Sequence, residues 1–556
     1  MTNATNANSD RRQHYDALVI GAGFAGMYQL HLLRDRLGLD VRVFEAGGGV
    51  GGTWYWNRYP GARCDTESHA YCFTFSEDLY LGWQWSERYP EQPEIVQYMN
   101  YAADKLDLKK DIQFETRVTA AEWDDTAGLW HVRTDPVGEY TARFLITAVG
   151  CLSAANVPEF PGRDSFKGEW YHTGHWPHEG VDFAGKRVGL IGTGSTGVQA
   201  TPVIAEQAAH LTVFQRTPNY SVPARNKPLE SDFQEWVKTN NREIRHYMRQ
   251  TPAGHPFEPC NRKAVETPPD ERERLLEEAW QIGGMQFRTV FNDLLLDKTA
   301  NQVVADFVTR KIREVVQDPE TARKLTAFDH HYSTKRPIID SHYFETFNRD
   351  NVSLVDVKAA PIEKITPDGI LTADGVEHKL DVIVFATGYD GVTGSLLRLN
   401  IRGRDDTLLN DLWKEGPKTY LGLQAPGFPN LFTITGPQSP SVLTNMPVAI
   451  EQHVEWIADT IAHMQNEGVE RIEPEPEAVA EWGRHVQETA EATLMVTAKS
   501  SWYLGANVPG KPRVFLPYPG GMARYRDICD QVAAKGYEGF AFSNGPATVA
   551  TASAAE

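Results

Sequence analysis

The sequence contains little cysteine. Of its 556 residues, five are cysteines, an odd number scattered along the chain: Cys64, Cys72, Cys151, Cys260 and Cys529. This distribution does not indicate a disulfide framework. No two of them form a close CxxC or CxxxxC pair, so the redox-active dithiol of the disulfide reductases is excluded.

Long apolar runs and an excess of basic residues are also missing. No apolar run approaches the roughly 20 residues that cross a bilayer, and residues 1–6 lack the basic and apolar regions of a signal peptide. The chain carries 55 Lys and Arg against 74 Asp and Glu, a net charge of -19, which argues against nucleic acid as a partner. We expect a cytoplasmic protein with no membrane partner. The sequence leaves its oligomeric state open, a monomer included.

The sequence also lacks the close spacing of His and Cys residues that is typical of a metal site. His172 and His175 are interpreted as residues that position the backbone and not as zinc ligands, so no metal is expected. The length exceeds that of one compact core, which predicts two or more domains. With 41% hydrophobic and 23% charged residues, the composition is that of an ordinary globular protein.

A glycine motif follows the first apolar strand, residues 15–20, and leads into a helical pattern. Gly21 permits a tight turn, Gly23 lets the backbone approach a pyrophosphate, and Gly26 lets helix and strand pack closely. The next strand ends in Glu45, about twenty residues after the glycines, where a carboxylate can accept from ribose hydroxyls. This pattern favours an adenosine without a 2'-phosphate, as in FAD.

A second unit repeats this layout. The strand at 187–191 enters the motif 192–197, and another strand follows at 211–214. Arg216 stands where the first unit has its glutamate, and an arginine can accommodate a 2'-phosphate. The second nucleotide is therefore interpreted as NADPH. Either motif alone is weak, but two with opposite charges at the ribose position indicate two dinucleotide sites.

Two apolar strands that end in glycine, 144–150 and 382–388, mark the points where the chain passes between domains. The prediction is an α/β fold with two Rossmann-like dinucleotide-binding domains. The FAD-binding domain is discontinuous and takes residues 11–150 and 389–545. The NADP-binding domain takes residues 151–388.

A helical insert is expected at 225–332 within the NADP-binding domain. Apolar residues from Val304 to Val315 recur at helical spacing, and Asp318-Pro319-Glu320 has the cap, first-turn proline and acidic residue of a helix start. The insert is interpreted as a cap near an active site, with simple core helices as the alternative. Residues 1–10 and 546–556 are polar or of low complexity and are expected to be disordered.

Between the two glycine motifs lies a segment that matches the pattern FxGxxxHxxxWP at every defined position. Its defined residues are Phe166, Gly168, His172, Trp176 and Pro177. It resembles the signature of the type I Baeyer-Villiger monooxygenases, a flavoprotein family that includes phenylacetone, steroid and cyclohexanone monooxygenases. His172 is interpreted as organising the linker between domains, with an acid or base role as the alternative.

A second match follows the first glycine motif. Residues 51–65 fit the pattern GGxWxxxxYPGxxxD, which is similar to the other signature of the same family. The resemblance extends from about Tyr15 to Phe542. It implies FAD contacts from the following residues: Gly52, Thr53, Trp54, Asp65, Tyr71, Val118 and Met446. It implies NADP contacts from a second set: Gly192, Thr193, Gly194, Ser195, Thr196, Gly197, Arg216, Thr217, Lys335 and Trp502.

The resemblance also implies the catalytic pair. Arg336, in Lys335-Arg336-Pro337, precedes an aromatic-rich segment ending in NRDNV at 352 and matches the family's active-site arginine. Asp65 would pair with it and orient it. Phe344 departs from the family, where a second tyrosine is common. The family's flavin-and-substrate loop implies a ketone pocket lined by Ser441, Val442, Leu443 and Met446.

The implied reaction is the oxidation of a ketone to an ester or lactone with NADPH and O2, through a C4a-peroxyflavin and a Criegee-type adduct. Bulky cyclic or aryl ketones are favoured, with sulfide oxidation as a side activity. Arg336 suits this chemistry because a guanidinium stays protonated and offers fixed donors to a developing oxyanion.

Other functions remain open from the sequence. An N- or S-oxygenating flavin monooxygenase shares the two nucleotide motifs but lacks the Trp176-Pro177 ending and the pair of Asp65 with Arg336. A non-catalytic redox sensor with two nucleotide sites is a more distant alternative. Trp502, assigned to a mobile loop over NADP and substrate, could instead be a packing residue.

Overall fold

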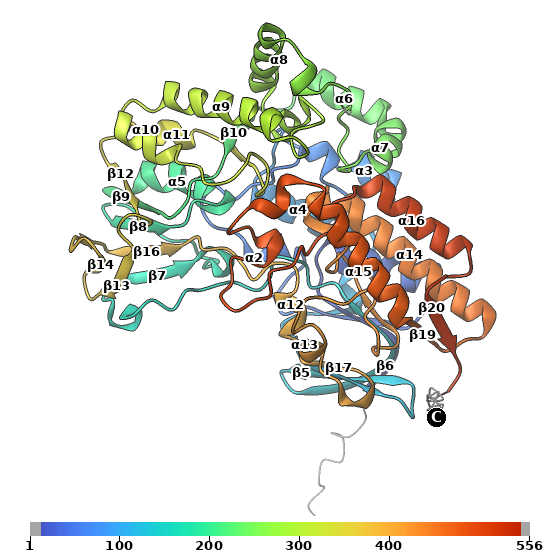
Figure 1. The fold of residues 1–556 in the computed structure, drawn as a ribbon. Helices are drawn as coiled ribbons and strands as arrows, with labels where there is room; N and C mark the ends of the chain where they lie inside the picture. Colours follow the sequence, from blue (N-terminus) through green and yellow to red (C-terminus); the bar gives the residue numbers. More distant parts are fainter. Residues whose placement is uncertain (1–12, 259, 546–556) are drawn as a thin grey trace, which may run out of the picture.

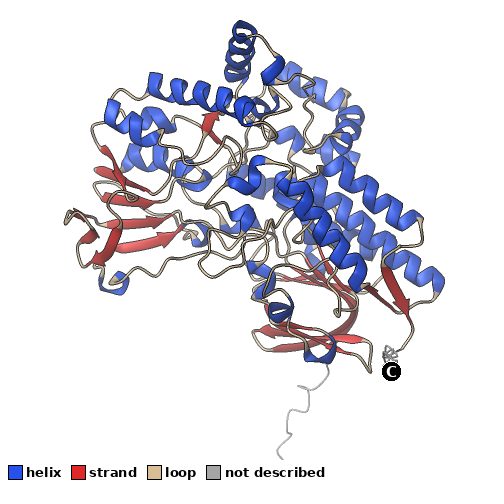
Figure 2. Cartoon of the chain, in the orientation of Figure 1, coloured by secondary structure: helices blue, strands red, loops and turns tan. Residues whose placement is uncertain are grey.

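The computed structural model describes residues 13–258 and 260–545. Two β-sheets with helices around them dominate the view in Figure 1, a mixed one in the blue and cyan first third of the chain and a parallel one in the green and yellow middle. Figure 2 shows helices on the outside of both sheets. The segments 1–10 and 546–556, predicted to be disordered, lie outside the described residues.

The first sheet has eight strands and brings together three distant parts of the chain. Strand β1 pairs in parallel with both β2 and β6, and β2 pairs in parallel with β3. Strands β4, β5 and β6 form an antiparallel meander. The strands are β1 (Gln13–Ile20), β2 (Val41–Phe44), β3 (Ile112–Gln113), β4 (Arg117–Asp124), β5 (Leu129–Asp135), β6 (Gly138–Thr147), β17 (Ile401–Arg402) and β18 (Leu431–Thr433).

Helices from both ends of the chain cover this sheet. The first helix, α1 (Phe24–His31), packs against α14 (Met446–Glu467), whose side chains join the same buried cluster as β1 and β2. Other helices around this unit are α4 (Gln92–Lys105), α15 (Pro476–Glu491) and α16 (Met522–Ala534). Residues beyond 400 therefore complete the unit that begins the chain.

The second sheet is entirely parallel, with the order β12-β9-β8-β16-β7. Its three inner strands are mainly apolar and buried, as parallel strands covered on both faces are, whereas the two edge strands are partly exposed. The strands of this sheet are β7 (Glu169–His172), β8 (Arg187–Ile191), β9 (His210–Gln215), β12 (Val352–Asp356) and β16 (Val382–Phe385), and α5 (Ser195–Gln207) connects β8 to β9. The predicted α/β fold with two Rossmann-like sheets is confirmed.

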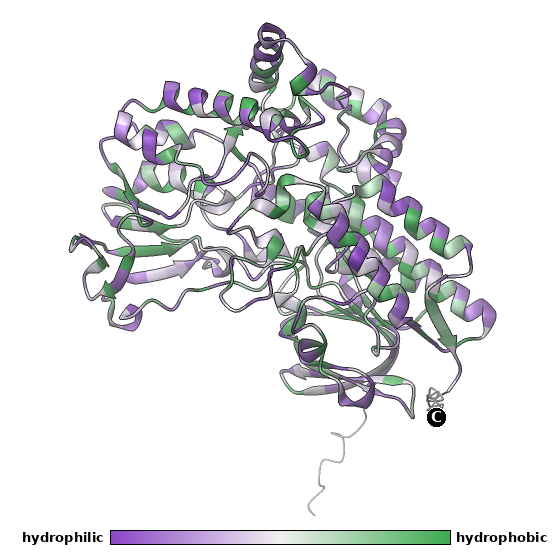
Figure 3. Cartoon of the chain, in the orientation of Figure 1, coloured by the Kyte–Doolittle hydropathy of each residue, from purple (hydrophilic) through white to green (hydrophobic). Residues whose placement is uncertain are grey.

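A mainly helical segment separates β10 (Ser221–Pro223) from β11 (Ile338–Asp340), which pair with each other. Its helices are α6 (Ser231–Thr239), α7 (Asn241–Gln250), α8 (Pro269–Ile282), α9 (Lys298–Val315) and α10 (Pro319–Leu325). The predicted cap of α10 is present, since the backbone N–H of Thr321 donates to Asp318 Oδ2 at 2.8 Å. Hydrophobic and hydrophilic residues alternate along α9 (Figure 3).

The helical segment packs on two different cores. Val237, Ile244 and Met248, from α6 and α7, join the core of the first unit, whereas the apolar face of α9 joins the core under the second sheet. The boundaries proposed for the domains and for the insert stay predictions. Among the helices of residues 13–258 and 260–545, none is long and apolar enough to cross a membrane.

The glycine motifs fold as predicted for strand-to-helix turns. A Cβ on Gly197 would lie 2.1 Å from the carbonyl oxygen of Gly192, and one on Gly26 would lie 1.8 Å from that of Gly21. Both contacts are far inside van der Waals distance. A Cβ on Gly194, in contrast, would meet no atom within 4 Å. The third glycine of each motif is thus required for packing, and Gly194 faces open space.

We predict that Gly197→Ala lowers the thermal unfolding midpoint, because its methyl group must displace backbone at a cost of about 1–3 kcal/mol. Gly194→Ala, in the same motif, is the matched control and should unfold within a degree or two of the parent. Differential scanning fluorimetry checks both. Equal midpoints for the two variants would contradict the packing role of Gly197.

Candidate active site

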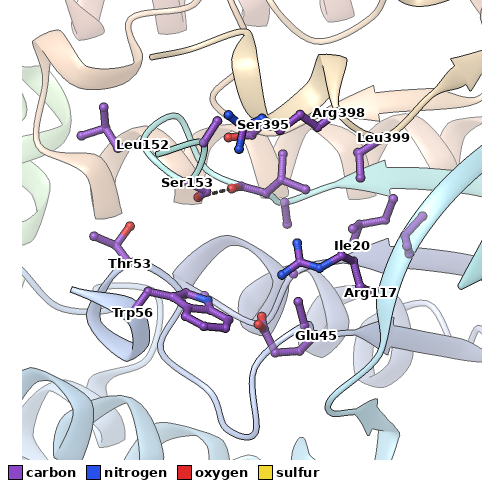
Figure 4. A pocket seen from close by; sticks show the side chains of 18 of the residues that line it. Ile20, Glu45, Thr53, Trp56, Arg117, Leu152, Ser153, Ser395, Arg398 and Leu399 are labelled. Atoms are coloured by element: carbon purple, nitrogen blue, oxygen red, sulfur yellow. Dashed lines mark hydrogen bonds between the residues drawn. The ribbon is translucent and has the colours of Figure 1, made fainter. Parts of the chain in front are cut away.

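A cavity of about 420 Å³ lies at the carboxyl ends of β1 and β2. Six of the residues predicted to contact FAD line it: Gly21, Gly23, Glu45, Gly52, Thr53 and Val118. Figure 4 shows Glu45 and Thr53 in this lining. Gly23 and Gly52 approach each other so closely that a Cβ on Gly52 would lie 2.9 Å from the Cα of Gly23. The wall is therefore made of bare backbone that a ligand can approach.

Glu45 is held rigidly at this cavity. Its Oε2 accepts from the backbone N–H of Ala22 at 2.7 Å, and its Oε1 accepts from that of Gly47 at 2.7 Å. The residue is only 5% exposed. Burial raises the pKa of Glu45 above its ordinary value, although the backbone donors oppose the rise. A carboxylate oriented in this way suits the acceptance of hydrogen bonds from vicinal ribose hydroxyls.

The same cavity contains charged residues that the sequence did not single out. Arg117, at the start of β4, and Arg398, from the segment after the second sheet, both line it. Burial, together with these two arginines, lowers the pKa of His175, which lies at the same wall. No spacing pattern identifies either arginine, because they lie 281 positions apart in the sequence. The two cations suit an anionic part of a ligand.

Other predicted FAD residues lie outside this cavity lining. Gly26 lies on α1 where this helix packs against the turn that follows β1. Trp54 donates from Nε1 to the hydroxyl of Tyr71 at 3.1 Å, and the ring of Tyr71 packs edge-on against Phe24. Met446 lies at the start of α14, packed with another buried cluster. Their contacts with FAD stay predictions.

The second glycine motif opens helix α5. Gly194 is its N-cap and provides no side-chain cap, so the first N–H groups of the helix have no side-chain oxygen from the cap residue. An exposed helix N-terminus beside bare glycine is a suitable site for a phosphate group. Thr193 ties the motif to the loop after β9, since its hydroxyl donates to the carbonyl oxygen of Thr217 at 3.1 Å.

Two cationic side chains, Arg216 and Lys335, lie near the end of β9. Burial lowers the pKa of Lys335, and the positive charge of Arg216 adds to this effect. The nearest carboxylate, Asp329, is 4.0 Å from the Lys335 ammonium and also binds Lys358 at 3.0 Å. Because Asp329 neutralises Lys335 only in part, Lys335 and Arg216 together are suited to bind a phosphate. This is the position where the sequence predicts the 2'-phosphate of NADPH.

A bidentate ion pair connects the two units. Arg336, just before β11, donates from Nε to Asp65 Oδ2 and from Nη2 to Oδ1, both at 2.8 Å. Asp65 lies in the loop after α2 (Thr53–Trp56). A third bond runs from Arg336 Nη1 to the carbonyl oxygen of Val442 at 2.7 Å. The two charged side chains are 25% and 20% exposed, so the pair is largely enclosed.

The charges of this pair stabilise each other. Burial alone would raise the pKa of Asp65, but the charge and hydrogen bonds of Arg336 outweigh burial and hold the pKa below its ordinary value. Burial alone would lower the pKa of Arg336, but the charge and hydrogen bonds of Asp65 outweigh burial and raise it. Both groups are therefore ionised at neutral pH.

The four residues predicted to form the ketone pocket adjoin this pair through Val442. Ser441 and Val442 are buried, and Ser441 donates to the carbonyl oxygen of Thr435 at 3.3 Å. Val442, Leu443 and Met446 pack in one cluster with Trp502 and Tyr503. None of the four lines the 420 Å³ cavity. Their role as pocket residues stays a prediction.

Trp502 packs closely against backbone. A Cβ on Gly391 would lie 2.8 Å from its Cε3, and its ring lies 4.7 Å from that of Tyr503. These contacts agree with the packing alternative without testing the proposed NADP contact.

The signature segment forms β7 and the turn after it. His172 is 2% exposed, and its Nδ1 accepts from the backbone N–H of Gly174 at 3.0 Å. Burial, with His175 nearby, lowers the pKa of His172 to about 4, so the ring is neutral. Gly174 leaves room for Tyr389, whose hydroxyl donates to Asn57 in the other signature segment. This arrangement favours the organising role proposed for His172.

The other signature residues are packing residues. Trp176 is buried beside Phe183, and a Cβ on Gly168 would lie 2.2 Å from the carbonyl oxygen of Asp381. Phe166 packs against the cluster formed by one face of the second sheet, and Pro177 follows Trp176 directly. Within the part of the chain that the structure describes, no group of three His, Cys, Asp or Glu side chains could hold a metal ion.

Known proteins resemble this arrangement over nearly its whole length. Residues 16–226 match a family model described as flavin-binding monooxygenase-like. A Baeyer-Villiger monooxygenase from Pseudooceanicola batsensis is 47% identical over 526 residues, which cover 94% of this chain and 95% of that protein. The chain belongs to the Baeyer-Villiger monooxygenases.

Two further relatives of this Baeyer-Villiger monooxygenase are informative. The solved structure of an oxidised steroid monooxygenase bound to NADP is 50% identical, has a TM-score of 0.91, and covers 96% of this chain and 100% of that one. A phenazine N-monooxygenase from Lysobacter antibioticus is 44% identical over 540 residues, covering 97% of this chain and 99% of that protein.

In this Baeyer-Villiger monooxygenase, we predict that Asp65→Asn lowers the free energy of unfolding by about 3 kcal/mol, because it leaves an enclosed guanidinium without its counter-ion. The pKa of Asp65 is lowered in the fold, so its stabilising effect is complete above the unfolded pKa of about 3.9 and disappears only as pH falls through the lower, folded value. The loss of thermal midpoint should therefore be constant from pH 5 to 8.

Asp381→Asn is the matched control. It removes an equally bidentate but exposed aspartate–arginine pair, whose side chains are 45% and 36% exposed, and should cost no more than about 1 kcal/mol. A loss for Asp65→Asn that shrinks between pH 8 and 6 would show that Asp65 titrates in the neutral range.

Proposed function

We propose that this chain oxidises a ketone to an ester or lactone, using NADPH and molecular oxygen. The observation that carries the proposal is the bidentate, largely enclosed Arg336–Asp65 pair, in a chain that also carries the two glycine motifs. The high similarity to a Baeyer-Villiger monooxygenase over the whole chain supports the same reaction.

The residues present fit the two expected cofactors. For FAD, they offer the glycine wall and the fixed carboxylate of Glu45 in the 420 Å³ cavity. For NADPH, they offer the open Gly194 at the start of α5 and the cations Arg216 and Lys335. The chemistry supplied by bound FAD is the activation of oxygen, with NADPH as the source of two electrons.

The role proposed for Arg336 follows from its geometry. A guanidinium has five N–H donors and stays protonated. Two of them bind Asp65 and one binds the Val442 carbonyl oxygen, while the Tyr503 hydroxyl lies beside the same group. The N–H groups left on Nη1 and Nη2 are shared between this hydroxyl and an oxyanion that develops when the ketone carbonyl is attacked. Because Asp65 and Val442 fix the orientation in advance, no reorganisation is needed during the reaction.

We predict that Arg336→Ala retains FAD and is still reduced by NADPH, but forms ester at least 10²- to 10³-fold more slowly, since a lost oxyanion donor costs about 3–4 kcal/mol. Product formation and flavin reduction should be measured separately, by gas chromatography and by stopped-flow absorbance. Arg323→Ala, which changes an exposed arginine on α10, is the control. Ester formation near the parent rate in Arg336→Ala would remove this arginine from the mechanism.

The substrate is proposed to be a bulky cyclic or aryl ketone, with sulfide oxidation as a side activity. The 50% identity to a steroid monooxygenase supports a large substrate. The test is aerobic incubation of the yellow protein with NADPH and a panel of linear, aryl, alicyclic and large-ring ketones, analysed for products one oxygen heavier. NADPH oxidation that yields hydrogen peroxide alone with every ketone would contradict the proposal.

N-oxygenation is a second candidate function. The phenazine N-monooxygenase covers the chain as completely as the Baeyer-Villiger relatives do, at similar identity. This one relative does not outweigh the Baeyer-Villiger relatives, but the panel should include a phenazine so that the two reactions are compared directly. An N-oxide formed faster than any ester would reverse the order of the two proposals. A cytoplasmic location stays a prediction from the sequence.

A further inference from the structure

A second cavity, of about 270 Å³, lies in the helical segment between β10 and β11. Two stretches of chain, 251–257 and 285–295, form most of its walls together with Cys260, and Ser333 closes it on the side of the Arg336 segment. The surface of this cavity is mainly apolar, and its apolar lining residues are Pro252, Ala253, Phe257, Met285, Phe291, Leu294 and Leu295. A mostly apolar cavity with a few polar groups is typical of a small-molecule site.

Arg288 is the charged residue of this lining. It lies on the 3-10 helix Met285–Thr289 and donates from Nε to the hydroxyl of Ser333 at 3.1 Å. Among residues 13–258 and 260–545, no carboxylate forms an ion pair with it. Burial lowers the pKa of Arg288, yet a guanidinium remains protonated at neutral pH. The cavity therefore holds a buried positive charge that no carboxylate of the described residues binds directly.

The cavity adjoins the proposed reaction centre. Ser333 precedes Arg336 by three positions, and Arg288 lies within electrostatic reach of Arg336, Asp65 and Tyr503. His255, also in the lining, lies within reach of Asp65, Arg288 and Arg336. A substrate whose carbonyl meets Arg336 can thus extend its remainder toward Arg288.

His255 adds a neutral polar group to the same wall. Its Nδ1 is buried and has no hydrogen-bond partner within the described ranges. Burial, with the charge of Arg288 next, lowers the pKa of His255 to about 3, so the ring is uncharged at neutral pH. An unpaired buried nitrogen costs free energy unless a ligand satisfies it. The Arg288 guanidinium and the His255 ring nitrogen together are suited to bind the two oxygens of a carboxylate.

We propose that the substrate is a ketone that also carries a carboxylate, and that Arg288 binds this carboxylate in the second cavity. The inference rests on the proposed ketone oxidation and specifies its substrate class. It differs from a role in NADPH binding, because the cavity lining contains neither the second glycine motif nor Arg216 and Lys335.

The test compares matched ketones. We would assay ω-benzoyl carboxylates with two to five methylene groups between carbonyl and carboxylate, each beside its methyl ester, and report the acid-to-ester ratio of kcat/KM. For at least one length the parent should prefer the acid. Arg288→Met should lower that ratio about 10- to 100-fold, as expected for the loss of a charge-assisted hydrogen bond. Arg288→Lys, which keeps the charge without the planar fork, should lower it less.

Arg274→Met is the matched control. Arg274 lies on α8 in the same helical segment, is 57% exposed and pairs with Glu278, so this variant should keep the parent ratio. The KM for NADPH should be the same in the Arg288 variants and the parent. A parent that treats acids and esters alike at every length, or an Arg288→Met variant with the parent ratio, would overturn the proposal.

A binding measurement separates this inference from the proposed function. Titration of the oxidised, FAD-loaded protein with the same acids should perturb the flavin absorbance, with dissociation constants that rise in Arg288→Met. If this happens while no ketone is converted, ketone oxidation is refuted and the anion site stands. If Arg288→Met fails to retain FAD, Arg288→Lys and Arg288→Gln carry the same comparison.

Discussion

The structure depends on one enclosed ion pair, between Arg336 and Asp65. Neither charge is stable in such a place alone, because removal of a charged group from water costs several kcal/mol that only a well-oriented counter-ion offsets. Asp65 belongs to the loop after the first sheet's glycine motif, and Arg336 precedes β11 beside the second sheet's unit. The Val442 carbonyl oxygen adds a third segment. The relative position of the two units is therefore constrained at the point where the proposed chemistry takes place.

The two nucleotide motifs use the same physical device. In each, a parallel strand ends in a glycine with positive φ, Gly21 at 104° and Gly192 at 114°, a conformation that side chains with a Cβ rarely adopt. The helix then begins without a side-chain cap. What distinguishes the two sites is the charge after the second strand, Glu45 in one and Arg216 in the other. A carboxylate accepts from hydroxyls and repels phosphate, and a guanidinium does the reverse.

Much of the fold could be predicted from the sequence because its signals are local. The strands, the glycine turns and the cap at Asp318 each depend on a few neighbouring residues. The Asp65–Arg336 contact spans 271 positions, and only the family resemblance pointed to it. Arg117, Arg398 and Arg288 gave no signal at all, because each reaches its cavity through tertiary packing and stands in no repeating pattern. The side chains at 441–446 show the same limit: Ser441 has φ of 44°, a local backbone turn that residue spacing does not reveal.

The distribution of charge has a final consequence for the site. The chain carries a net charge of -19, yet the proposed centre is rich in cations: Arg288 lines the second cavity, and Lys335 and Arg336 follow Ser333 of the same lining within three positions. Only Asp65 offsets Arg336 directly. In a low-dielectric interior, Arg288 raises the positive potential at the remaining donors of Arg336 and so strengthens their pull on a developing oxyanion. An anion bound at Arg288 would weaken that pull while improving substrate binding. The separation between the two guanidinium groups therefore sets the balance between affinity for an anionic ketone and the rate of its oxidation.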